Sequence, residues 1–114
     1  MSNLPYHLYN INLLTGENLS GDLNSPSINI NTTRSYAVQF NWTGASSPVG
    51  EVSVYGSNDD ITFTQVIDSL SPVLGNSGSC LINVEFPSYG FVKVNYKRTS
   101  GGGGVVNCSI NGKR

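Results

Sequence analysis

The side chains that most often carry acid–base chemistry are few and scattered along this sequence. A hydrolytic enzyme needs a base that titrates near neutral pH, and the one histidine is His7, close to the start of the chain. His7 is better interpreted as a surface or packing residue than as a base. The only adjacent carboxylates, Asp59 and Asp60, lie in a predicted turn, where neighbouring side chains point apart into water. We therefore expect no catalytic residues and no enzyme activity.

Metal and cofactor chemistry is equally poorly supported by the spacing of residues. Residues 58–60 offer hard oxygen ligands, but the distal glutamate of a calcium-binding loop is missing. Cys80 and Cys108 lack the paired spacing of a zinc site. The glycine run Gly101–Gly104 is not followed by the Lys-Ser/Thr and helix of a phosphate-binding loop. The sequence thus predicts no metal and no cofactor.

The remaining candidates are aromatic side chains that the alternation of residues turns outward. Tyr55 and Phe91 are predicted on the outer faces of strands, and Tyr89 lies at a strand edge. Tyr6 and Tyr9 add two aromatics near the start of the chain. Exposed aromatics mark protein–protein contacts more often than isolated surface positions, and they also form sugar-binding platforms. We take these five residues as the candidate contact surface and keep both interpretations open.

Composition excludes several classes of protein. The chain has 114 residues, of which 38% are hydrophobic and 11% charged, with a formal net charge of −1. Six cationic side chains cannot form a phosphate-neutralising stripe, so general nucleic-acid binding is excluded. No apolar run is long enough to span a membrane, and the N-terminus has no signal-peptide pattern. We expect synthesis in a cytoplasm without export.

An alternation of period two dominates the chain and predicts short strands with one buried and one polar face. Ser35–Thr43 is the clearest example, with Tyr36, Val38, Phe40 and Trp42 on one face. No segment has helical periodicity, so the sequence predicts an all-β, single-domain antiparallel β-sandwich, jelly-roll-like or immunoglobulin-like, with about seven or eight strands. We expect residues 31–114 to form the sandwich and residues 1–30 to be an extended N-terminal arm or its first strands.

Turn-forming residues separate these strands. Residues 44–50 and 101–104 are predicted as loops, the second as a flexible hairpin loop. Residues 57–60 are predicted as a tight turn that leads into a returning strand at 61–66. Cys80 and Cys108 fall on inward faces of their strands, which leaves a disulfide between them open.

Five short motifs follow one another along the chain. They are a Trp-Gly strand end (40–44), a Gly-Ser-Asn-Asp turn (52–60), a Tyr-x-Phe-Val-Lys-Val strand (89–96), a Thr-Ser-Gly loop (99–101) and a closing Gly-Lys (111–113). In this pattern, over roughly two thirds of its length, the chain resembles small bacteriophage virion structural proteins. Asp60 departs from the pattern, which has glycine after Asn-Asp.

The resemblance implies a non-enzymatic structural protein of the virion, most of all a capsid decoration (cement) protein. A tail or fibre accessory protein, or a carbohydrate-binding or host-adhesion module, is the alternative. Its partners would be the major capsid protein or tail and neck proteins, and copies of itself, with no nucleic acid and no membrane. If residues 1–30 are an arm, deletion of residues 1–25 should abolish assembly and leave a folded core.

Overall fold

The computed structural model describes residues 8–113, and this part of the chain consists of strands and connections without a helix. The prediction of an all-β fold is confirmed. No helix in residues 8–113 is therefore long and apolar enough to cross a membrane. The eight strands are β1 (Leu8–Glu17), β2 (Leu23–Asn24), β3 (Ile28–Asn29), β4 (Ser35–Ser57), β5 (Thr64–Gln65), β6 (Ser71–Leu74), β7 (Gly78–Glu85) and β8 (Phe91–Lys113).

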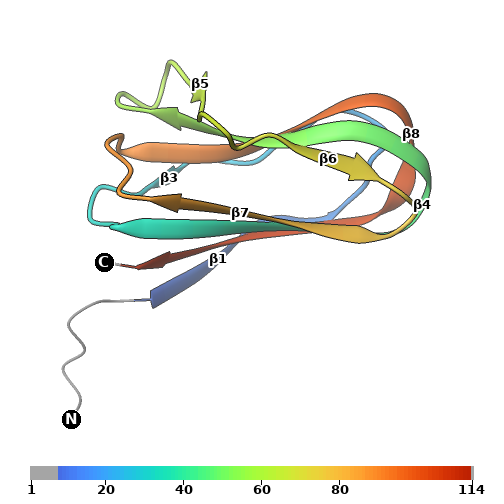
Figure 1. Cartoon of the computed structure of the whole chain (residues 1–114), viewed down its shortest axis with the longest axis horizontal. Coiled ribbons are helices and arrows are strands. Elements are labelled where there is room, and N and C mark those ends of the chain that lie inside the picture. Colours follow the sequence, from blue (N-terminus) through green and yellow to red (C-terminus); the bar gives the residue numbers. More distant parts are fainter. Residues whose placement is uncertain (1–7, 114) are drawn as a thin grey trace, which may run out of the picture.

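The sandwich is one continuous antiparallel sheet folded back on itself, as Figure 1 shows. The two 23-residue strands β4 and β8 pair along almost their whole length, from Ser35 with Lys113 to Ser57 with Phe91. Both strands bend at their middle, and each therefore belongs to two layers. The first layer has the order β1, second half of β8, first half of β4, β7. The second layer contains the other halves of β8 and β4, flanked by β2 and β3 on one side and β5 and β6 on the other.

The corner between the layers lies where the sequence predicted two loops, and those loop predictions are wrong. Residues 44–50 belong to β4, and Gly101–Gly104 continue β8 instead of forming a flexible hairpin loop. Gly44 and all four glycines of the run Gly101–Gly104 have positive φ, and the β4–β8 register slips between Ser46 and Gly50. A Cβ on Gly101 would overlap the carbonyl oxygen of Ser47, and one on Gly104 would lie 2.5 Å from that of Thr43. Glycine is needed here because the two bent backbones touch.

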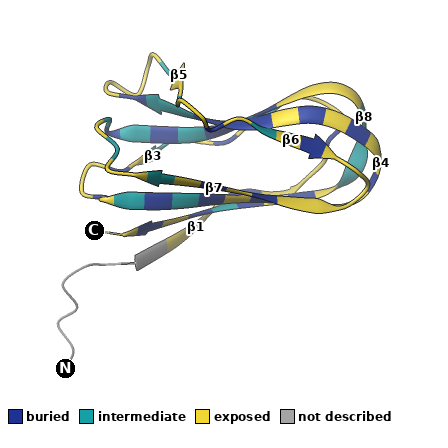
Figure 2. Cartoon of the chain, in the orientation of Figure 1, coloured by how far each residue is buried: buried dark blue, intermediate teal, exposed yellow. Residues whose placement is uncertain are grey.

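The core fills the space between the two layers with the inward side chains that the alternation predicts, and Figure 2 shows the buried positions alternating along β4 and β8. Phe40 lies at its centre, with ring centroids 6.0 Å from Trp42 and 5.8 Å from Tyr96. The indole Nε1–H of Trp42 donates a hydrogen bond of 2.9 Å to the carbonyl of Gly75. This bond satisfies the one polar group of a buried indole.

The two cysteines lie in the core but cannot form a disulfide. Phe40 of β4 is paired with Cys80 of β7 on one side and with Cys108 of β8 on the other. The cysteines are therefore two strand spacings apart, about 10 Å at about 4.8 Å each. A disulfide requires Cα atoms within about 7 Å. Both thiols are buried and free.

The described part of the N-terminal segment, residues 8–30, supplies β1, β2 and β3 to the sheet. Leu13, Leu14, Leu19 and Ile30 are buried in the common core. Ser25 binds β8 twice through Val94: its N–H donates to the carbonyl (2.9 Å), and its hydroxyl accepts from the Val94 N–H (2.8 Å). Residues 8–30 therefore add strands to the sheet and side chains to its core.

Candidate interaction surface

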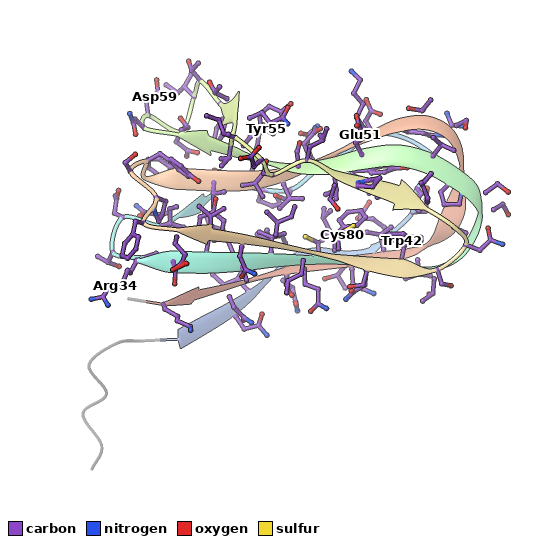
Figure 3. The ribbon with its side chains drawn as sticks, in the orientation of Figure 1. Arg34, Trp42, Glu51, Tyr55, Asp59 and Cys80 are labelled. Carbon is purple, nitrogen blue, oxygen red and sulfur yellow. The ribbon has the colours of Figure 1, made fainter. Side chains whose placement is uncertain are left out.

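Aromatic side chains from three segments gather around one lysine on the outer face of the second layer. Lys93 of β8 lies directly opposite Tyr55 of β4 in the register, and its Nζ lies 4.6 Å from the centre of the Phe63 ring. Phe91 is two residues before Lys93 and therefore on the same face. These four side chains, each half-buried, are called the aromatic patch. Figure 3 shows Tyr55 projecting outward, whereas Trp42 and Cys80 lie between the layers.

Tyr89 does not join Tyr55 and Phe91 on that face. Its hydroxyl lies 2.7 Å from the hydroxyl of buried Tyr36, and its ring covers Gly56, where a Cβ would be 2.7 Å away. Tyr89 thus closes the open end of the sandwich from inside, and burial raises the pKa of its phenol. Tyr6, His7 and the side chain of Tyr9 lie outside the part of the chain that the structure describes.

The turn after β4 is held by Asp59. Its carboxylate accepts hydrogen bonds from the backbone N–H groups of Ile61 and Thr62, both at 2.9 Å, and from the Ser57 hydroxyl at 2.8 Å. These bonds, those from the backbone of Thr62 and Ile61 first, lower the pKa of Asp59 to about 2. The neighbouring Asp60 carboxylate accepts from Ser27. Both carboxylates therefore stabilise the connection, and residues 8–113 contain no cluster of three acidic, histidine or cysteine side chains that could hold a metal ion.

The prediction of a returning strand at residues 61–66 is wrong except at two residues. Only Thr64–Gln65 pairs with β4, and the rest of the segment up to β6 follows the edge of the second layer as irregular chain. Three large apolar side chains on this segment are exposed, by 83% at Ile61, 87% at Ile67 and 50% at Leu70, and Leu74 at the end of β6 is exposed by 60%. We call them the apolar edge.

Sequence reasoning missed the apolar edge and Phe63, because it treated Ile61 and Phe63 as members of a paired strand. The signal present was the failure of alternation after Val66, where Ile67 and Leu70 are separated by Asp68 and Ser69. Ser69 turns inward, and its hydroxyl bonds the backbone N–H of Val54 at 3.1 Å. Figure 2 shows the resulting exposure around β5.

The same fold occurs in several solved structures. The SPBc2 prophage-derived protein YomS matches with a TM-score of 0.63 and 14% identity, over 100% of this chain and 99% of YomS. The PBSX exported protein XepA matches with a TM-score of 0.63 and 12% identity, over 100% of this chain and 40% of XepA. The VP2 protein of infectious bursal disease virus, in derived T=1 particles, matches with a TM-score of 0.61 and 12% identity, over 94% of this chain and 32% of VP2.

These likenesses show that the chain shares its fold with phage-derived and viral proteins. No protein-family model and no curated protein sequence matches the chain at a significant level.

Proposed function

We propose that this chain is a non-enzymatic structural protein of a phage virion that binds neighbouring virion proteins through its second layer. The observation that carries the proposal is the apolar edge beside the aromatic patch. Ile61 and Ile67 are more than four-fifths exposed, although side chains of this size bury well. Large apolar groups that are exposed one after another along one edge of a sheet are typical of contacts with other proteins.

Two further features support this role. The fold is shared with phage-derived proteins and with a VP2 protein found in T=1 particles. The formal net charge of −1 spread over 114 residues allows many copies to lie close together, because like charges would otherwise repel. The partners we propose are the major capsid protein and further copies of this chain.

Within the virion, we favour a capsid decoration protein that lays its second layer on capsid subunits. Lys93 at the centre of the aromatic patch supplies a cation that a carboxylate of a partner can bind, and its contact with the Phe63 ring holds it in place. A tail or fibre accessory protein is the alternative, because the same surface could bind a tail or neck subunit.

The test is co-sedimentation of the purified chain with capsids, and separately with tails, that have been stripped of accessory proteins. Light scattering gives the mass of the free chain beforehand. We expect binding to capsids, with Ile67→Ser and Ile61→Ser each weakening it about tenfold, the loss typical of a residue central to an interface. Both side chains are exposed, so these variants should fold normally.

Val105→Ser is the matched control, because Val105 is also exposed (49%) but belongs to the first-layer half of β8, whereas Ile61 and Ile67 lie along the edge of the second layer. It should bind like the unchanged protein. Binding to tails alone would favour the tail accessory role, and a chain that sediments with neither structure would contradict the proposal.

A further inference from the structure

The outer face of the first layer carries a groove at its open end, away from the aromatic patch. The groove has a volume of about 710 Å³ and runs across all four strands of the layer. Six polar side chains line it, namely Asn10, Ser35, Asn83, Glu85, Asn111 and Lys113. Their positions in the register place them on one face of the sheet, opposite to the inward Tyr36 and Val84.

Two rows of side chains build the groove. The longer row crosses the layer as Asn10, Asn111, Ala37 and Asn83 and spans about 14 Å at about 4.8 Å per strand spacing. The small side chain of Ala37 forms the floor between two asparagines. In the next row, Lys113 and Glu85 lie on either side of Ser35.

The polar side chains of this groove have no hydrogen-bond or ion-pair partner among residues 8–113, unlike those nearer the corner on the same face. There, the Gln39 amide donates to the Ser79 hydroxyl (3.3 Å), which donates to Asn41 Oδ1 (2.6 Å). Asn107 Oδ1 accepts from the backbone N–H of Gly16 at 3.2 Å. On the outer face of the first layer, the polar side chains near the corner thus bond within the protein. The amides of the groove are instead free to bind a ligand.

The chemistry of the lining selects a class of ligand. Three carboxamides and a hydroxyl offer both donors and acceptors, which suits hydroxyl groups, since each hydroxyl donates one hydrogen bond and accepts others. One lysine and one glutamate together give no net charge to attract a phosphate chain. Polar and apolar surface contribute in similar measure to the lining, so the groove lacks the mostly apolar wall that drug-like apolar ligands need.

We propose that this groove binds a neutral saccharide, with Asn10, Asn83 and Asn111 bonding its hydroxyls. Lys113 donates to, and Glu85 accepts from, hydroxyls at the end of the groove, where charged partners give stronger hydrogen bonds. The site does not depend on the virion role proposed above. If that role holds, the groove faces away from the surface that the second layer binds, because it lies on the opposite layer.

The test follows the amide signals of the ¹⁵N-labelled full chain by NMR while a neutral saccharide is added. The probes are glucose, galactose, N-acetylglucosamine and the disaccharides maltose and cellobiose. At least one probe should shift the side-chain amide signals of Asn83 and Asn111 in a saturable manner. Asn83→Ala and Asn111→Ala should each weaken the apparent affinity about tenfold, because each removes a partner for a ligand hydroxyl.

Asn107→Ala is the control, since Asn107 is the same residue type on the same face of β8 but outside the groove. It should leave the affinity unchanged. No saturable shift with any probe, or equal shifts at Asn107 and Asn111, overturns the proposal. Capsid binding by Asn83→Ala is measured in parallel, so loss of saccharide binding with intact capsid binding separates the two surfaces.

Discussion

At the scale of single residues, Cys108 shows how burial alone decides the chemistry of a nucleophile. Its side chain is 1% exposed on the inner face of β8, and burial raises the pKa of the thiol to about 12. The thiolate is the reactive form, so the thiol is inert at ordinary pH. The pKa of the Cys108 thiol is higher in the folded chain than in the unfolded chain, so ionisation of this thiol opposes folding. The stability that the buried, protonated thiol contributes is therefore complete below about pH 9 and is lost as the pH rises toward 12.

We therefore predict that a thiol reagent such as DTNB at pH 8 leaves both buried cysteines unmodified in the folded protein and titrates both in denaturant. In the Cys108→Ala variant one thiol should remain. Rapid reaction of a thiol in the native protein would mean that the first layer opens far more often than its packing indicates, and a disulfide would contradict the register around Phe40.

At the scale of elements, the glycines of β8 are needed for two different reasons. Some must be glycine because their backbone has positive φ, and others also because a Cβ would collide with the opposite strand. Gly101 and Gly103 both have positive φ, at 71° and 77°, but only Gly101 has backbone atoms of the opposite strand where a Cβ would lie. Gly103 has open space there. The pair therefore allows the two costs to be measured separately.

We predict that Gly101→Ala lowers the free energy of unfolding by about 3 kcal/mol, from left-handed strain and overlap with Ser47 together. Gly103→Ala, the matched control, should cost about 1 kcal/mol from backbone strain alone. Urea unfolding of both variants measures the difference. Equal losses would show that β4 moves away from β8 at the corner at little cost.

At the scale of the whole molecule, residues 8–30 contribute to the same core as the long hairpin. Removing residues 1–25 deletes Leu13, Leu14 and Leu19, whose burial is worth about 2 kcal/mol each. The sum of about 6 kcal/mol is comparable to the total stability of a small domain. The deletion also exposes the edge of β8 that pairs with β1.

We predict that the chain without residues 1–25 is unfolded or aggregates, which circular dichroism and light scattering would show. Addition of a synthetic peptide of residues 8–25 should restore the far-ultraviolet spectrum of strands. A truncated chain that stays monomeric and folds cooperatively would instead show that the segment is an arm, as one of the two interpretations of the sequence had it.

The sequence alone determined the inward and outward faces of the regularly alternating segments, because alternation is a local property that each segment carries by itself. Tyr36, Val38, Phe40 and Trp42 point inward as their spacing predicts. The resemblance in turn motifs likewise pointed to phage proteins, and the fold comparison agrees.

Tertiary structure decided how these strands are joined. A run of glycine and serine has the same composition in a surface loop as in a sheet corner, and only the opposite strand shows that Gly101–Gly104 continue β8. The direction of Tyr89 and the groove between Asn83 and Asn111 depend on partners more than 25 residues away in the sequence. Such long-range pairing is set by the packing of the whole sheet, which no local pattern records.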